Sequence, residues 1–149
     1  MDAIDLRLVE LLRGNARLSY AELARQVGLS APAVHERVGK LESGGVIRGY
    51  RADVEPESVG LGVTALIGIV QDSGGDHDEV LEAVRGMPEI ESCYFMAGVE
   101  SFTLKARVGT IAELEDVILR LNRIPGVAST RTAIALSTKW ENRPQPVVR

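Results

Sequence analysis

The chain has 149 residues, of which 45% are apolar, and its formal net charge at pH 7 is −4. That length can bury a hydrophobic core in one domain or in two small ones. The single cysteine, Cys93, excludes an internal disulfide and favours a reducing compartment. No apolar run approaches the roughly 20 residues that cross a bilayer, and no basic leader opens the chain, so we expect a cytoplasmic protein with no membrane partner.

Charge differs between the two parts of the chain. Residues 1–50 hold seven Lys and Arg against six Asp and Glu, a net +1, whereas residues 51–149 hold ten against fifteen, a net −5. Because affinity for nucleic acid comes from Lys and Arg that displace counterions from phosphates, the total charge alone argues against such a partner. The asymmetry gives weak support for two domains that have different partners.

Three helices are predicted in the first third of the chain. Apolar residues recur at helical spacing in three stretches, and a glycine follows each one. Ser19 and Glu22 form a capping box at the start of the second helix. Ser30 is the expected N-cap of the third helix, where Pro32 is tolerated in the first turn. Counted with their caps, the predicted helices cover residues 4–12, 19–28 and 30–43.

A strand is predicted after the third helix, at residues 46–51, because this segment alternates and is rich in β-branched side chains. A short capped helix, a glycine turn, a second capped helix and a strand with Arg48 and Arg51 have the order of a winged helix-turn-helix. We therefore assign residues 1–51 to such a domain. The polar face of the third helix could lie in a major groove, although an ordinary solvated face is the alternative for this helix alone.

The rest of the chain alternates strands and helices. Pro56 lies in a polar stretch that we assign to a linker, residues 52–61. Residues 62–140 are then expected to form a second domain, and residues 141–149 an extended tail. The predicted strands are 63–71, 90–97, 102–108 and 127–136, and the predicted helices are 76–85 and 112–121. This βαββαβ order, together with a weak repeat of residues 87–93 at 124–130, favours a ferredoxin-like sheet, so the fold class is α+β.

Short stretches of the third helix and the residues after it resemble the leucine-responsive and asparagine-responsive regulators, the Lrp/AsnC family. They are Leu29-Ser30, Val34, Arg37-Val38, Leu41-Glu42, Gly45-Val46-Ile47 and Gly49-Tyr50. Further stretches extend the resemblance over essentially the whole chain. They are Ile4-Asp5, Leu8, Leu11-Leu12, Gly98, Leu104-Lys105, Arg107-Val108, Pro125-Gly126-Val127 and Thr130-Arg131-Thr132.

The resemblance implies a sequence-specific, DNA-binding transcriptional regulator that is not an enzyme and needs no cofactor or metal. Its expected partners are double-stranded DNA, a small effector that is usually an amino acid, and further copies of the chain. Such proteins dimerise through the sheet of the C-terminal domain and often assemble to octamers. The expected location is the cytoplasm, in association with the nucleoid.

The resemblance also indicates which side chains contact DNA. The candidates are Ser30, Arg37 and Lys40, followed by Ala31, Pro32 and His35. Arg and Lys can donate to guanine or to phosphates, and Ser30 can donate to a phosphate at the start of the helix. Gly39 departs from the family, which usually has a basic residue at this position.

The effector site is expected between C-terminal domains. Its candidate residues are Gly98, Val99, Glu100, Ser101, Phe102, Thr130, Thr132 and Ile134. In the family the loop before the third strand of this domain carries two acids, where this chain has Val99 and Ser101. Glu100 is its only carboxylate and lies one residue out of register, a shift that can turn a side chain to the other face. The sequence leaves open whether Glu100 replaces the missing acid.

Two other functions remain open at this point. Some tetrapyrrole-side-chain decarboxylases resemble this two-domain family, although the chain has only two histidines for such chemistry. His35 and His77 fall in different predicted domains, so a zinc site is not expected. The second alternative is a ligand-binding or assembly module whose helix-turn-helix no longer binds DNA.

Overall fold

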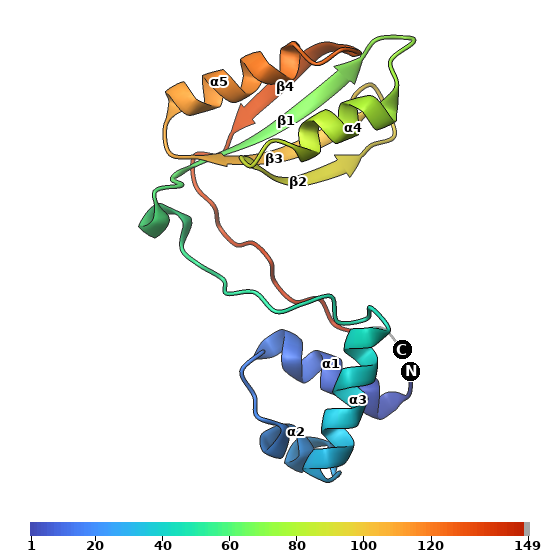
Figure 1. Ribbon diagram of the computed structural model, residues 1–149. Helices are drawn as coiled ribbons and strands as arrows, with labels where there is room; N and C mark the ends of the chain where they lie inside the picture. Colours follow the sequence, from blue (N-terminus) through green and yellow to red (C-terminus); the bar gives the residue numbers. More distant parts are fainter. Residues whose placement is uncertain (148–149) are drawn as a thin grey trace. The chain divides into compact units, whose positions relative to one another are not determined.

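The computed structural model describes residues 1–147, and the chain divides into two compact units (Figure 1). One unit is Met1–Asp53 together with the described residues from Trp140 onward. The other unit is Val54–Lys139. Each unit has a hydrophobic core of its own.

The N-terminal unit contains the three predicted helices. They are α1 (Ala3–Gly14), α2 (Tyr20–Val27) and α3 (Ala31–Ser43). The capping box predicted at Ser19 and Glu22 is confirmed, because each side chain accepts a hydrogen bond from the backbone N–H of the other residue. Gly28 ends α2 with φ at 71°, a left-handed conformation that favours glycine. The helix-turn-helix therefore follows directly from caps and turn residues.

The core of this unit comes from one apolar stripe on each helix. Its buried residues are Leu8, Leu12, Leu23, Ala24, Val34, Val38 and Leu41. On α3 the buried positions recur at i, i+4 and i+7, which leaves the opposite side of the helix exposed. The expected core face of the third helix is thereby confirmed.

The strand predicted at residues 46–51 is wrong, because the described structure gives this segment no strand. Instead, the backbone N–H groups of Val46 and Ile47 both donate to the carbonyl of Leu41, at 2.9 and 3.0 Å. The hydroxyl of Tyr50 donates to Glu42 Oε1 at 2.8 Å. These contacts fold the segment back onto the end of α3 rather than beside another strand. A β-rich sequence without a pairing partner has no ladder to join.

The C-terminal unit is an antiparallel sheet with two helices. Its strands are β1 (Val63–Gln71), β2 (Ile90–Phe95), β3 (Phe102–Val108) and β4 (Val127–Ile134), in the spatial order β2-β3-β1-β4. The helices α4 (His77–Arg85) and α5 (Ile111–Asn122) cover the same face of the sheet (Figure 1). The predicted βαββαβ fold is confirmed, and β2 and β4 each end two residues earlier than predicted.

The core of the sheet unit lies between the sheet and these helices. Alternate residues of β1 and β3 point into it: Ala65, Ile67, Ile69, Phe102, Leu104, Ala106 and Val108. Because side chains alternate along a strand, the residues between them lie on the other face of the sheet, which no helix of this unit covers. We call this the open face.

The segments at the two predicted domain borders are irregular. A short 3-10 helix, Pro56–Val59, lies within the predicted linker. After β4 the described residues form no further helix or strand. In this part of the chain, the carbonyl of Gln145 accepts a hydrogen bond from Arg13 Nη1 of α1 at 2.6 Å. No helix of the described residues is long and apolar enough to span a bilayer.

Candidate nucleic-acid interface and effector region

Helix α3 exposes most of the side chains that the sequence assigns to DNA contact. Ser30, Pro32, His35 and Lys40 are exposed, whereas Ala31 is half-buried. The Ser30 Oγ accepts a hydrogen bond from the backbone N–H of Ala33 at 3.4 Å, and Ser30 thereby caps the helix. Its hydroxyl proton stays available to a phosphate beside the free N–H groups of the first turn.

Arg37 is the exception among these candidates, because its guanidinium binds two carboxylates of the same unit. Its Nη1 donates to Asp5 Oδ1 at 2.7 Å and to Asp2 Oδ2 at 2.8 Å. These hydrogen bonds raise the pKa of Arg37 further above its usual value. The backbone N–H of Asp5, followed by Arg37, lowers the pKa of Asp2. Arg37 and Asp2 are therefore both charged at neutral pH.

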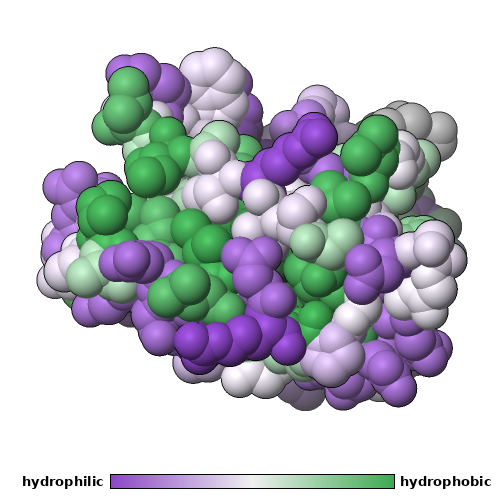
Figure 2. Space-filling model, turned by 90° about the horizontal axis from the view of Figure 1, so that it is seen from above, coloured by the Kyte–Doolittle hydropathy of each residue, from purple (hydrophilic) through white to green (hydrophobic). Residues whose placement is uncertain are grey.

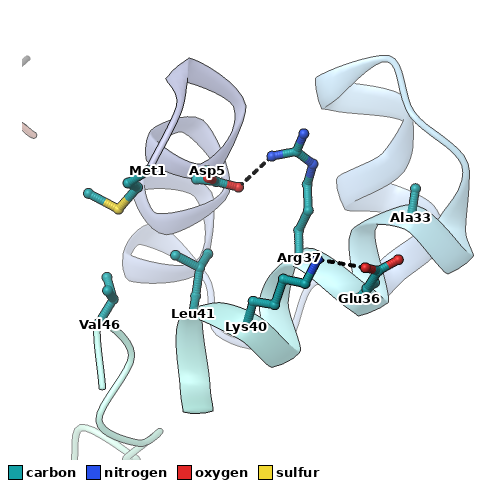
Figure 3. A pocket seen from close by; sticks show the side chains of 8 residues that line it. All are labelled: Met1, Asp5, Ala33, Glu36, Arg37, Lys40, Leu41 and Val46. Atoms are coloured by element: carbon teal, nitrogen blue, oxygen red, sulfur yellow. Dashed lines mark hydrogen bonds and ion pairs between the residues drawn. The ribbon is translucent and has the colours of Figure 1, made fainter. Parts of the chain in front are cut away.

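Lys40 forms an ion pair that is more exposed than that of Arg37. Its Nζ donates to Glu36 Oε1 at 2.7 Å, and both side chains are exposed, by 73% and 68%. Figure 3 shows this pair along α3 and the Arg37 side chain reaching across to Asp5. An exposed i,i+4 pair contributes a few tenths of a kcal/mol. Lys40 can therefore exchange Glu36 for a phosphate at little cost.

Four exposed arginines of this unit form no side-chain hydrogen bond or ion pair among the described residues. They are Arg17, Arg25, Arg48 and Arg51. Arg48 and Arg51 lie in the predicted strand, but no sequence pattern assigns them to DNA contact. A sequence shows that an arginine is present, but not whether a distant acid already binds it.

The effector-loop candidates lie between β2 and β3. Gly98 has φ at 129°, and Val99 is 71% exposed. The backbone N–H of Ser101 donates to the carbonyl of Ile69 at 2.8 Å, which fixes the loop to β1. Phe102, in contrast, is 3% exposed and belongs to the core.

Glu100 lies over Gly68 on the open face. A Cβ atom on Gly68 would be 2.3 Å from Glu100 Cδ and 2.5 and 2.7 Å from its carboxylate oxygens. The carboxylate thus occupies the space that a side chain at Gly68 would take. Gly68 pairs with Thr103 and Arg131 on the neighbouring strands, so Arg131 shares this face of the sheet.

The β4 candidates lie on the other side of the sheet. Thr130, Thr132 and Ile134 pair with Ile69, Ile67 and Ala65, whose side chains face the helices. The Thr130 hydroxyl donates to Asn122 Oδ1 of α5 at 3.3 Å. Within one chain, the structure therefore separates the β4 candidates from Glu100 and does not unite them in one pocket.

His77, which the sequence assigns to no site, lies beside the effector loop. The ring of His77 makes edge contacts with Phe95 and Phe102, at 5.1 and 6.0 Å between centroids. Phe95 is 67% exposed at the end of β2. No sequence signal links α4 to β2, because the three rings meet only through the fold. Within residues 1–147, no group of three His, Cys, Asp or Glu side chains could hold a metal ion.

The open face carries charge and exposed apolar side chains. Glu91 accepts hydrogen bonds from Lys105 at 3.1 Å and from Arg107 at 2.6 Å. Desolvation raises the pKa of Glu91, but these two cations outweigh it, so the pKa lies below its usual value. On the same face, Leu66 is 49% and Tyr94 is 58% exposed. Figure 2 shows that apolar side chains interrupt the polar surface of the molecule.

Two family models match the chain, one for each unit. The AsnC-type helix-turn-helix domain matches residues 1–42. The Lrp/AsnC ligand binding domain matches residues 63–145. Together they include the exposed face of α3 and every effector candidate.

Curated relatives match nearly end to end. The HTH-type transcriptional regulator LrpA of Mycobacterium tuberculosis is 38% identical over 143 residues, 96% of this chain and 95% of LrpA. The regulatory protein AsnC of Escherichia coli K12 is 36% identical over 137 residues, 91% of this chain and 90% of AsnC. Both are named as regulators, and neither name supports the decarboxylase alternative.

Solved structures agree with these matches. A feast or famine regulatory protein of M. tuberculosis, complexed with L-methionine, has a TM-score of 0.92 at 38% identity and covers 98% of this chain and 99% of its own. E. coli AsnC has a TM-score of 0.86 at 34% identity, with 95% of each chain covered. The chain belongs to the Lrp/AsnC family of DNA-binding transcriptional regulators.

Proposed function

We propose that this regulator responds to an amino acid or a related metabolite, which binds between C-terminal units and changes how an oligomer holds its DNA. The observation that carries the proposal is the M. tuberculosis relative, which is complexed with L-methionine and matches this chain across both units. The match to a ligand binding domain over residues 63–145 gives independent support.

The exposed face of α3 is the proposed DNA reader. Ser30, Ala31 and Pro32 begin the helix, where free backbone N–H groups favour a phosphate. His35 and Lys40 lie further along and can reach base edges or phosphates in a major groove.

The proposed effector site needs more than one copy of the chain. Glu100 lies on the open face, whereas Thr130, Thr132 and Ile134 lie on the helix side. A site that uses both sets therefore joins parts of different copies. In this arrangement the Glu100 carboxylate pairs with the effector ammonium group, and Gly98, Val99, Ser101 and Phe102 form the loop around it.

The open face is the proposed dimer interface. It combines exposed apolar side chains, Leu66 and Tyr94, with charges that are already paired, which suits burial against a second copy. Dimers would assemble further, with an octamer as the expected state, in the cytoplasm at the nucleoid. Several helix-turn-helix units held together raise the effective concentration at neighbouring half-sites, which compensates for the near-neutral charge of each one.

DNA binding is tested by fluorescence anisotropy at several salt concentrations. The probes are duplex DNA from upstream of the chain's own gene and a random duplex of equal length. We expect the upstream duplex to bind at least tenfold more tightly, because base contacts add to the shared phosphate contacts. Equal affinity for both duplexes would contradict the proposal and favour an assembly module without DNA function.

Effector binding is tested by a thermal-shift screen of the twenty amino acids and common keto acids. A ligand that binds only the folded state raises the midpoint of unfolding by mass action. We expect at least one amino acid to do so, and Glu100→Gln to remove the shift. If no compound shifts the midpoint, the proposed effector class is wrong.

A further inference from the structure

We propose that Arg37 is a positioning residue, which fixes α3 to the start of α1, and that it does not contact DNA. The inference rests on the proposed function, in which α3 reads DNA, and it changes the role of one residue in that helix. It begins from the two acids that the Arg37 guanidinium binds, Asp2 and Asp5.

Asp2 and Asp5 already bind each other's backbone. Asp2 Oδ1 accepts from the Asp5 N–H at 2.9 Å, and Asp5 Oδ2 accepts from the Asp2 N–H at 3.0 Å. This is a capping box at the start of α1. Each acid thus uses one oxygen for the box and keeps its second oxygen free for another donor.

Arg37 binds those two remaining oxygens. Its Nη1 donates to Asp2 Oδ2 at 2.8 Å and to Asp5 Oδ1 at 2.7 Å. Four hydrogen bonds therefore join two backbone N–H groups, two carboxylates and one guanidinium, which we call the Arg37 clasp. Hydrogen bonds between charged groups are shorter and about twice as strong as neutral ones. The clasp links residues that are 35 and 32 positions apart in the chain, so it fixes the tertiary position of α3 and not its helical state.

Exposure distinguishes the clasp from the other ion pair of α3. The side chains of Arg37 and Asp5 are 32% and 17% exposed and that of Asp2 is 53% exposed, whereas those of Lys40 and Glu36 are 73% and 68% exposed. Figure 3 shows Arg37 directed toward Asp5 of α1, while Lys40 lies along its own helix beside Glu36. Both pairs line the same cavity, whose volume is about 560 Å³. Both hydrogen bonds use Nη1, so any contact of Arg37 with DNA would have to use its other N–H groups, beside the two carboxylates that hold the side chain against α1.

The charge of the clasp also argues against phosphate contact. One guanidinium and two carboxylates carry a formal net charge of −1. A phosphate that approaches this site meets two negative groups and one cation that they already bind. The phosphate contacts then depend on Lys40 and on exposed cations that form no side-chain hydrogen bond or ion pair among the described residues, such as Arg25 in the last turn of α2.

The test compares four variants of the full chain by anisotropy, on the upstream duplex and the random duplex, at several salt concentrations. Arg37→Ala removes the cation, and Asp2→Asn with Asp5→Asn removes both acids but keeps good capping side chains. Arg25→Ala is the matched control, because it removes an exposed arginine of the same unit. The fourth variant combines Arg37→Ala with both Asp→Asn changes. All measurements are made well below the unfolding midpoint of each variant.

We expect Arg37→Ala to lower the preference for the upstream duplex several-fold and to leave the slope of log affinity against log salt unchanged. The double Asp→Asn variant should do the same, and combining all three changes should add nothing further, because both variants break one clasp. Arg25→Ala should reduce the slope by about 0.9, the effect of one lost phosphate contact.

Three results would overturn the proposal. A reduced salt slope in Arg37→Ala would make Arg37 a phosphate contact. A higher DNA affinity in the double Asp→Asn variant would show that the acids merely restrain a DNA-binding cation. A lower unfolding midpoint with an unchanged preference would leave Arg37 a stabilising role alone. The unchanged chain is measured first, and only a lack of preference there would refute the proposed function together with this inference.

Discussion

The two units of this regulator use their charged side chains differently. In the helix-turn-helix unit, Arg37 joins α3 to α1 through two acids at the surface. In the sheet unit, Lys105 and Arg107 share Glu91 on the open face, with only 13% and 12% of their side chains exposed. One arrangement positions a helix, and the other pairs charges on a surface that we propose a second copy covers.

The hydrophobic cores of the two units differ in size. The sheet unit buries fourteen residues in one cluster, whereas the helix-turn-helix unit buries seven, and the two clusters share no residue. A small core supplies less stabilisation, so caps and ion pairs contribute a larger fraction in the helix-turn-helix unit. Because the cores share no residue, we expect a core substitution in one unit to lower the stability of that unit and not of the other.

The largest expected effects come from truncating the cores. Ile67 in the sheet unit and Leu8 in the helix-turn-helix unit are both fully buried. Replacing either by Ala should lower the free energy of unfolding by about 2–5 kcal/mol. In calorimetry, Ile67→Ala should lower the transition of the sheet unit, and Leu8→Ala that of the helix-turn-helix unit.

Val46→Ala is the matched control for the core variants, because Val46 is 50% exposed. It should change stability by less than about 0.5 kcal/mol. A single transition that both core variants shift equally would show that the units unfold together, against the separation of their cores.

The next effect concerns Gly68, whose missing side chain leaves room for Glu100. Gly68→Ala forces the Glu100 carboxylate to move, but the end of a flexible side chain moves at little cost. We expect the unfolding free energy to change by about 1 kcal/mol or less, while the thermal shift produced by the effector is lost. The measurement is the thermal-shift assay with the amino acid identified in the screen.

Gly62→Ala is the control for this variant, because its added Cβ meets only Glu57 Cγ at an ordinary 3.7 Å. It should keep the full effector shift. If Gly68→Ala also keeps that shift, Glu100 does not bind the effector from its present position on the open face.

The sequence predicts the parts of both units that depend on local pattern. Helical spacing, the capping box at Ser19 and Glu22, and the alternation of β1 and β3 define the helices and strands within a few residues. The family resemblance also extends over both units. These features are local because caps and periodicity report on residues that are neighbours along one element.

The features that the sequence does not predict arise between elements. In the sequence, Arg37 cannot be distinguished from a helical cation that is exposed to solvent. Only the fold places its guanidinium beside Asp2 and Asp5. The carboxylate of Glu100 lies over Gly68, which is far from it in the chain. The strand predicted at residues 46–51 failed for a related reason, since strand propensity cannot show whether a partner strand exists.

The smallest expected effect tests whether the exposed face of α3 meets DNA. Gly39 lies inside this helix, and an added Cβ would meet no atom within 4 Å. Gly39→Ala should therefore raise the unfolding free energy of the helix-turn-helix unit by about 1 kcal/mol without changing the salt dependence of DNA binding. Gly39→Lys should bring a similar gain and steepen the salt slope by about 0.9, because it adds one phosphate contact. The alanine variant separates the helical gain from the charge, so a lysine variant with unchanged salt dependence would mean that this face of α3 does not meet the DNA backbone.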